Sequence, residues 1–426
     1  MSGAMLELTD DRRLSLTQLV SAWLAQHRED RSAAEPPVEV REVEVLRAGR
    51  PGLLDVIAEA EGRAVHAVLG VRRLGEETQS LGTTDDPVLG LFEDDEGLGM
   101  VVDALHDAEL APLVLAAVTG DDTPVTGVTP VADTDEGVVL AFAERCTLTV
   151  FPRLFDGLHP GVELLVALDE AGFNHLAAPV ALWRRGGRDL GVVQELLAGS
   201  AGGWALALTS LRDLYASGGL PEEAGGDFGP EGRALGTMTA RMHLALDRSF
   251  GRRSEDVTER VDSVERIVVA ADPALLDAPG VGEAFEALRA ANLHGPVLHT
   301  HGDFHLGRTA RTDQGWVVAD CMPGGVPPGA TDVVFRSPLA DVADMLWSLH
   351  HVASVAASER DPTGRSGLAA LAQGWEARNR RAFLSGYLAT PGIGGLVPTD
   401  RETVGKLAAV FELERAAARI MQLGAG

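Results

Sequence analysis

The chain has 426 residues, with 63 acidic and 36 basic side chains and a formal net charge of −27 at pH 7. This excess of negative charge argues against nucleic acid or an anionic membrane surface as a partner. The length is enough for two or three domains with a sizeable hydrophobic core.

The first region, residues 1–110, is expected to form a small α+β domain that acts as an N-terminal cap. Hydrophobic periodicity predicts a helix first, then alternating strands and a second helix. The predicted elements are a helix over Leu14–Gln26, strands over Val38–Leu46, Leu53–Glu61 and Ala64–Val71, and a helix near Met100–Leu110.

Residues 111–200 read as short strands with one helix, and residues 201–426 as mainly helical. The helix of the middle region is predicted over Val162–Ala171, before Gly172. In the last region helices are predicted over Trp204–Ser217, Pro230–Asp247, Ser254–Ala271, Val281–Leu293, Pro338–Ala357, Leu371–Leu388 and Asp400–Leu423. A pair of strands, Pro296–Thr300 and Trp316–Cys321, interrupts them.

The most informative motif lies in this strand pair. The run His301-Gly302-Asp303-Phe304-His305 leaves the end of the first strand, and Asp320 lies near the end of the second. Two carboxylates are thereby brought near each other, as phosphoryl transfer requires. One positions the attacking hydroxyl and accepts its proton, while the other holds Mg²⁺ on the nucleotide phosphates. A rival interpretation takes His301, Asp303 and His305 as a metal-binding triad.

The two cysteines, Cys146 and Cys321, fall in predicted buried strands and give no disulfide framework. Free core thiols fit a reducing compartment. The N-terminus has no basic-then-apolar signal, and no apolar stretch is long enough to span a bilayer. These features favour a cytoplasmic location.

The whole chain resembles the actinobacterial maltokinases and glucosamine kinases, within the aminoglycoside-phosphotransferase-like group. The strongest matches are the His301 motif with Asp320, the segment Ser337-Pro338-Leu339-Ala340-Asp341, and Trp375-Glu376. The resemblance implies an α+β, two-lobed protein-kinase-like fold with an N-terminal maltokinase-type cap and a mainly helical C-lobe. It divides the chain into a cap (1–110), an N-lobe with hinge (111–200) and a C-lobe with the catalytic-type loop (201–426).

The resemblance also implies roles for individual residues. Asp303, with His301 and His305, takes the catalytic position, and Asp320 takes the metal-binding position. The sugar site would draw on Trp375, Glu376 and Arg380. The nucleotide site would draw on Thr149, Arg153, Glu163, Gln194, Glu195 and Arg308. His243 is expected to order the C-lobe, while Asp341 is explained equally well by helix-start electrostatics and by a hydrogen bond to the catalytic loop.

Several residues depart from the family pattern. Thr149 replaces the lysine that clamps the phosphates, and the chain's single lysine is Lys406. Arg308 replaces an amide ligand of Mg²⁺, and a guanidinium has no lone pair for a metal. We therefore expect Arg308 to pair with Asp303 or Asp320. Met322 stands where the family has an acidic residue, two positions after Asp320. The turn that covers the phosphates in the family is acidic here, with the sequence Ala132-Asp133-Thr134-Asp135-Glu136-Gly137.

Two hypotheses follow. The first is a maltokinase-like homologue with an impaired nucleotide and Mg²⁺ site, a pseudokinase or regulatory subunit in α-glucan or trehalose metabolism. A trehalose synthase or an active maltokinase would then be its partner. The second is an active ATP-dependent kinase of maltose or an amino sugar such as glucosamine, with Asp303 as the base. ATP and Mg²⁺ are cofactors of the second, and the first needs neither.

Overall fold

A computed structural model describes residues 4–6, 9–27, 37–73, 88–94, 97–125, 127–134, 137–143, 145–223, 226–291, 293–322, 335–360 and 367–424. These residues form two compact units. Unit 1 comprises the described residues within Met1–Glu163 and Ala178–Leu196. Unit 2 comprises those within Leu164–Ala177, Leu197–Pro323 and Asp332–Gly426. The three-region division of the sequence is a different partition and stays a prediction.

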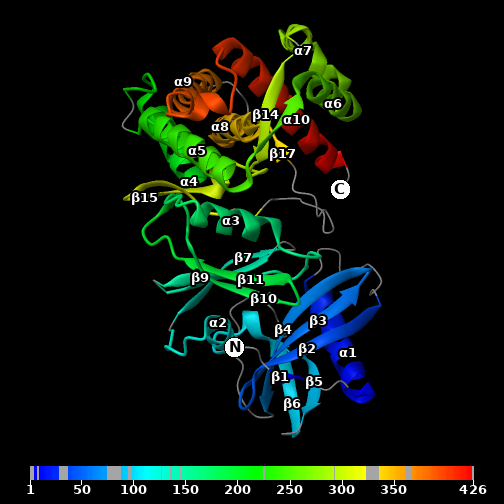
Figure 1. Cartoon of the computed structure of the whole chain (residues 1–426). Helices are drawn as coiled ribbons and strands as arrows, with labels where there is room; N and C mark the ends of the chain where they lie inside the picture. Colours follow the sequence, from blue (N-terminus) through cyan, green and yellow to red (C-terminus); the bar gives the residue numbers. More distant parts are fainter. Residues whose placement is uncertain are drawn as a thin grey trace. The chain divides into compact units, whose positions relative to one another are not determined.

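Unit 1 begins with a six-stranded antiparallel sheet in the order β1-β2-β3-β4-β6-β5. Its strands are β1 (Ala4–Met5), β2 (Val38–Arg47), β3 (Gly52–Ala60), β4 (Arg63–Arg73), β5 (Val88–Asp94) and β6 (Gly97–Asp103). Helix α1 (Asp10–Gln26) packs on this sheet (Figure 1). Its buried residues Leu16, Leu19, Val20 and Trp23 recur at helical spacing, so one apolar face meets the sheet.

A second sheet of unit 1 has the order β10-β11-β9-β8-β7. Its strands are β7 (Val128–Thr134), β8 (Gly137–Phe142), β9 (Cys146–Val150), β10 (Pro179–Arg185) and β11 (Arg188–Glu195). The 3-10 helix η1 (Ala104–His106) and helix α2 (Leu110–Thr119) connect the first sheet to the second. Helix α3 (Pro160–Glu170) follows β9.

Unit 2 is mainly helical (Figure 1). Its longer helices are α4 (Gly203–Ser217), α5 (Gly229–Phe250), α6 (Val257–Ala271), α7 (Val281–Ala290), α8 (Pro338–Arg360), α9 (Leu368–Leu388) and α10 (Arg401–Gly424). Two small sheets, β12-β15-β16 and β13-β14-β17, lie among them. Their strands are β12 (Ala201–Gly202), β13 (Arg252–Asp256), β14 (His294–His299), β15 (Thr309–Thr312), β16 (Gly315–Val318) and β17 (Phe335–Arg336). The remaining 3-10 turns are η2 (Pro273–Asp277), η3 (Leu306–Arg308) and η4 (Ile393–Gly395).

Helices α5 and α9 approach each other closely because glycines lie between them. A Cβ atom on Gly386 would clash with the carbonyl oxygen of Arg233, and one on Gly236 would clash with that of Phe383. Each helix thus presents a bare backbone surface to its neighbour. This close packing places His243 of α5 beside Tyr387 of α9.

Most of the predicted helices are confirmed, but two expectations were wrong. Residues near Met100–Leu110 form β6 and η1 rather than a helix, because Val101 and Val102 pair with β4 and β5. The start of the helix predicted over Ser254–Ala271 is instead strand β13, which pairs with β14. Among the described residues, no helix combines the length and apolar character needed to cross a membrane.

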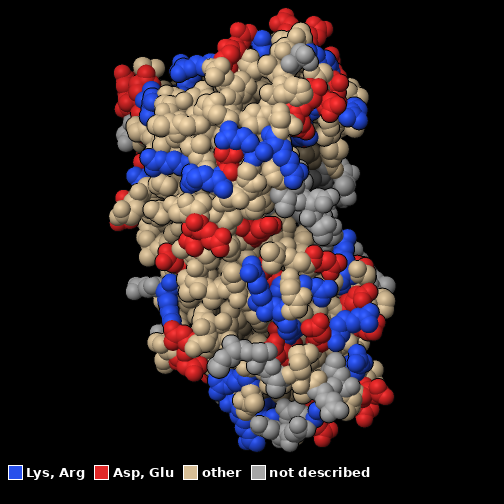
Figure 2. Space-filling model, in the orientation of Figure 1, with Lys and Arg blue, Asp and Glu red and all other residues tan. Residues whose placement is uncertain are grey.

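Acidic and basic side chains are interspersed on the face shown in Figure 2. The net charge of −27 is therefore not gathered into one acidic patch on this face. Many arginines among the described residues have carboxylate partners, as the pair of Arg252 and Asp247 illustrates at 2.5 Å.

Candidate active site

The loop that follows β14 is held by one buried carboxylate. Asp341, in the first turn of α8, accepts hydrogen bonds from the backbone N–H groups of His301 (2.8 Å) and Gly302 (2.9 Å). Asp341 is completely buried. Of the two interpretations of Asp341, the structure therefore supports the hydrogen bond to the loop.

Asp341 is in turn fixed by side chains of α5 and α9. The Nε2 atom of His243 lies 3.1 Å from the Asp341 carboxylate, and the Nδ1 atom of His243 lies 2.9 Å from the Tyr387 hydroxyl. Burial opposes the ionisation of Asp341, but His243 and the loop N–H groups hold its pKa below the usual value. The predicted ordering role of His243 thus has a definite target, the carboxylate under the loop.

The two carboxylates of the motif are brought together by one guanidinium. Arg308, in η3, donates from one terminal nitrogen to Asp303 at 3.1 Å and from the other to Asp320. The predicted pairing of Arg308 is thereby confirmed, whereas its role toward a nucleotide stays a prediction. A guanidinium suits this place because its donors lie in a rigid fork.

The remaining oxygens of both carboxylates also have protein donors. Arg415, from α10, donates to the other oxygen of Asp303 at 2.7 Å. The backbone N–H of Met322 donates to the other oxygen of Asp320 at 2.7 Å. Each of the four carboxylate oxygens therefore accepts a hydrogen bond from the protein.

Asp303 lies in a strongly cationic environment. Burial alone would raise its pKa, but His305, 3.5 Å away, and Arg415 hold the pKa of this carboxyl far below its usual range. The Nδ1 atom of His305 accepts the N–H of Gly307, so its Nε2 atom carries the proton that points at Asp303. A carboxylate held in this way is a weak proton acceptor.

His301 is placed to hold the loop in position and not to react with a substrate. Its side chain is buried, and its Nε2 donates to the backbone carbonyl of Asp320 at 2.9 Å. Burial lowers the pKa of His301, so the imidazole stays neutral. The bond ties the loop to the end of the neighbouring strand.

A third carboxylate, Asp344, lies one helical turn after Asp341 on α8. Its oxygen is 3.7 Å from the Nε of Arg415. Burial raises the pKa of Asp344 to about 7, although Arg415 opposes this shift. Neither Asp344 nor Arg415 was predicted as a residue of this site. The Asp341/Asp344 spacing was a usable signal, but nothing in the sequence near Arg415 points to a partner 112 positions away.

The proposed nucleotide-binding residues of unit 1 lie on its second sheet. Thr149 is buried in β9, between Val139 of β8 and Val192 of β11. Gln194 is buried in β11 opposite Thr147, and the next residue, Glu195, is exposed with its N–H bonded to Ala178. Their contact with a nucleotide stays a prediction.

Of the other two candidates in unit 1, one precedes α3 and the other lies within it. Arg153 is exposed and forms an isolated β-bridge with Val65, and Glu163 is half-buried in the first turn of α3. In the acidic turn, Asp133 is hydrogen-bonded to His106 at 3.0 Å. Asp135 and Glu136 lie outside the described residues.

The three candidate sugar-binding residues lie on α9 in unit 2. Trp375 is 1% exposed, and its indole N–H donates to Ser210 at 2.9 Å, as expected for a packing residue. Glu376 lies 3.0 Å from His350, and Arg380 pairs with Glu412 at 2.6 Å. Contact of these three residues with a sugar stays a prediction.

No protein-family model matches the chain. It is 31% identical over 302 residues to a glucosamine kinase of Streptacidiphilus jiangxiensis, covering 66% of this chain and 66% of that protein. A glucosamine kinase of Mycolicibacterium smegmatis (strain ATCC 700084 / mc(2)155) is 30% identical over 249 residues, covering 55% of this chain and 60% of that protein. The matches thus span just under two thirds of these relatives' length.

Solved structures show the same fold over nearly the whole chain. A glucosamine kinase in complex with glucosamine, ADP and inorganic phosphate has a TM-score of 0.64 at 20% identity, covering 95% of this chain and 94% of that one. A second crystal form has a TM-score of 0.66 and covers 96% and 94%. The chain therefore has the α+β, protein-kinase-like fold of the sugar phosphotransferases, which confirms the predicted fold class. Within that class it is a homologue of the glucosamine kinases.

Proposed function

We propose that this chain is a sugar-kinase homologue that binds a sugar of the amino-sugar class but has lost efficient Mg²⁺-dependent phosphoryl transfer. The observation that carries the proposal is the place of Arg308. Its guanidinium contacts both carboxylates of the motif, Asp303 and Asp320. This arrangement does not fit a divalent cation, because the guanidinium already lies between the two carboxylates and would repel a second cation there.

The missing lysine supports the same proposal. Thr149 stands where the resemblance places a phosphate-clamping lysine, and the chain's single lysine, Lys406, lies in α10. Removing one electrostatic donor from a transition state typically costs about 10²–10³ in rate. Loss of a lysine and a metal ligand together would lower the rate by a factor on the order of 10⁴–10⁶ if the two effects were additive. Groups that act as a unit are not additive, so this factor is only a guide. Kinase turnover is typically ~1–100 s⁻¹.

The test is a coupled ADP-release assay with maltose, glucose and glucosamine, run beside Asp303→Ala. We expect no sugar-dependent ADP release above background for either protein. Turnover near ~1 s⁻¹ that vanishes in Asp303→Ala would overturn the proposal, because that rate lies within the range of working kinases. Sugar binding is tested separately by calorimetry without nucleotide, and glucosamine is the first ligand because the relatives are glucosamine kinases.

A second candidate function is an active ATP-dependent kinase of glucosamine or a related sugar. The observation that favours it is that Asp303 and Asp320 are both retained. Asp303 lies in the loop whose backbone N–H groups are held by Asp341. In that case ATP and Mg²⁺ would be the cofactors, and Arg308 would have to leave both carboxylates when the nucleotide binds. A thermal-shift titration with Mg-ATP separates the two candidates, because a ligand that binds the folded state raises apparent stability as its concentration exceeds Kd.

If the chain acts by binding, it needs an active partner. The resemblance to maltokinases makes a trehalose synthase or an active maltokinase the candidate. Co-purification of the full chain with each enzyme, followed by a measurement of that enzyme's rate with and without the chain, tests this part of the proposal. An unchanged rate and separate elution would reject it.

A further inference from the structure

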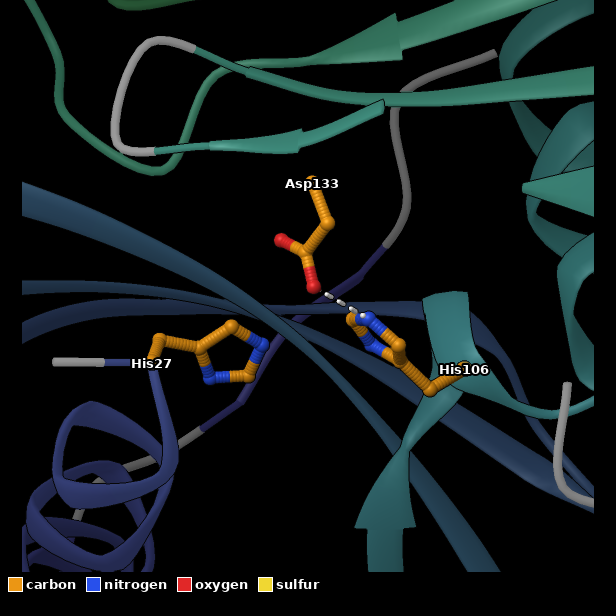
Figure 3. A group of neighbouring side chains, drawn as sticks. All are labelled: His27, His106 and Asp133. Carbon is orange, nitrogen blue, oxygen red and sulfur yellow. Dashed lines mark hydrogen bonds and ion pairs between the residues drawn. The ribbon is translucent and has the colours of Figure 1, made fainter. Parts of the chain in front are cut away.

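Two histidines and a carboxylate converge in unit 1, whereas the kinase-type loop belongs to unit 2. They are His27 at the end of α1, His106 at the end of η1 and Asp133 in β7 (Figure 3). One nitrogen or oxygen atom from each lies within 4.8 Å of the others. Among the described residues this is the only such group of three metal-ligating side chains, and it does not include the rival triad of His301, Asp303 and His305.

The hydrogen bond of His27 to the backbone places the proton of its neutral ring on Nδ1. Its Nδ1 atom lies 2.8 Å from the backbone carbonyl of Trp23, which can only accept, so Nδ1 carries the hydrogen. In the neutral imidazole the lone pair is then on Nε2. Metal-binding histidines commonly donate their other N–H to a backbone carbonyl or a carboxylate, because that bond fixes the tautomer and the ring orientation.

His106 is arranged in the same way. Its Nδ1 lies 3.2 Å from the carboxylate of Asp103, and its Nε2 lies 3.0 Å from Asp133. Asp103 is buried and is fixed by the indole N–H of Trp23 at 2.6 Å. In histidine–metal sites one ring nitrogen binds the metal and the other faces a supporting carboxylate. Here Asp103 is the supporting carboxylate, and the exposed Asp133 lies next to the nitrogen that would bind the metal.

Two carboxylates face the two histidines at this place. The same oxygen of Asp103 lies 3.4 Å from His27 Nε2 and 3.2 Å from His106 Nδ1, and Asp133 adds a second carboxylate. The side chains of His27 and His106 are 19% and 20% exposed, and that of Asp133 is 48% exposed. An ion from solvent can therefore reach the ligand atoms.

We propose that His27, His106 and Asp133 bind a divalent transition-metal ion, with Zn²⁺ as the best fit. Two imidazole nitrogens and one carboxylate oxygen are ligands that Zn²⁺ accepts in tetrahedral geometry, with water in the fourth position. Zn–N and Zn–O bonds are about 2.0–2.2 Å long, so ligand atoms that lie within 4.8 Å of one another must move closer together to bind one ion. Imidazole ligands disfavour Mg²⁺, which prefers oxygen, and the absence of sulfur disfavours Cu⁺.

The site would join three separate segments of unit 1. Residue Asp133 belongs to β7, which pairs with β8 to form the hairpin that the family resemblance places over the phosphates. His27 and His106 belong to the region of the first sheet, at the ends of α1 and η1. A bound ion would fix this hairpin to the first sheet.

The experiment uses the full chain, stripped with a chelator and exchanged into metal-free buffer. Titration with Zn²⁺ by calorimetry should show one ion per chain, and Co²⁺ should give the visible absorption of a low-coordinate site. Hydrogen exchange should slow in residues 127–134 when Zn²⁺ is added. Absence of saturable binding, or protection elsewhere without protection of this strand, would overturn the proposal.

Variants locate the ligands. Asp133→Asn changes an exposed residue and should keep the fold while weakening Zn²⁺ binding by roughly 100-fold or more, since even outer-layer changes cost 10–100-fold. His106→Ala should have a similar effect. The matched control is His350→Ala, because His350 also pairs with a carboxylate, Glu376 at 3.0 Å, but has no third ligand in the group described here. Equal loss in the control and in Asp133→Asn would reject the assigned ligands.

Discussion

The guanidinium of Arg308 lies 3.1 Å from the carboxylate of Asp303, five residues earlier in the same loop. A second nitrogen of the same guanidinium contacts Asp320. A permanent cation thus stands between two carboxylates that could otherwise share a divalent ion. Because a guanidinium does not lose its proton in proteins, raising the pH does not remove this cation.

Replacing Arg308 with glutamine should make the loop depend on Mg²⁺. Asp303 and Asp320 would repel each other in Arg308→Gln, so the metal-free variant should lose about 1–3 kcal/mol of unfolding free energy. Added Mg²⁺ should restore that loss, since an amide oxygen is a metal ligand and a guanidinium is not. The measurement is the unfolding midpoint with and without Mg²⁺, which we expect to be nearly unchanged by Mg²⁺ in the wild type.

The matched control for this prediction is Arg311→Gln. Arg311, in β15, pairs with Glu231 of α5 at 2.9 Å, and its ion pairs among the described residues include no second carboxylate. It should show no Mg²⁺ dependence. Adding Thr149→Lys to Arg308→Gln should raise Mg-ATP affinity by roughly tenfold or more, about 1.4 kcal/mol or above. A Mg²⁺ response in Arg311→Gln, or none in Arg308→Gln, would contradict our interpretation of Arg308.

Asp344 should make the protein less stable as the pH rises. Its pKa is raised from 3.8 to about 7 in the folded state, mainly by burial. Between these two values the folded state holds a proton that the unfolded state releases, so the unfolding free energy falls as pH increases across this window. Asp344→Asn removes this titration. We expect the variant to be more stable than the wild type at pH 8, with the difference shrinking toward pH 4, as measured by urea denaturation.

Asp341, on the same helix, should behave in the opposite way. Its pKa is lowered, so its contribution is present above the unfolded pKa and is lost as the pH falls through the folded value. Asp341→Asn leaves the N–H groups of His301 and Gly302 with a weaker acceptor. The cost should be about 2–4 kcal/mol at neutral pH, as for other buried charge networks. A variant as stable as the wild type at pH 7 would argue against Asp341 as the support of the loop.

The sequence predicted the parts of this site that are local and missed the parts that are distant. The strand–loop–strand pattern was sufficient to bring Asp303 near Asp320, and the departure at Arg308 was sufficient to predict its pairing. Arg415 could not be predicted, because its contact with Asp303 depends on how α10 packs in unit 2. The His27 and His106 cluster was missed for the same reason, since its members lie on three segments that no local pattern connects.

The packing of α5 against α9 gives a prediction whose control lies in the same helix. In Gly386→Ala the added methyl group would clash with the carbonyl oxygen of Arg233, so the two helices must separate. Overpacking of this kind should cost about 2–3 kcal/mol or more. In Gly374→Ala the nearest atom to the new methyl group is 3.9 Å away, at Pro221.

The two substitutions should therefore have opposite signs. Gly374→Ala should gain about 0.5–1 kcal/mol, because alanine loses less backbone entropy than glycine in a helix. Chemical denaturation of both variants measures the difference directly. Gly386→Ala should also loosen the bond between His243 and Tyr387, which depends on the same helix contact and supports Asp341 under the loop. Destabilisation of equal size in both variants would mean that α9 resists any added methyl group, and the close approach at Gly386 would then not explain the effect.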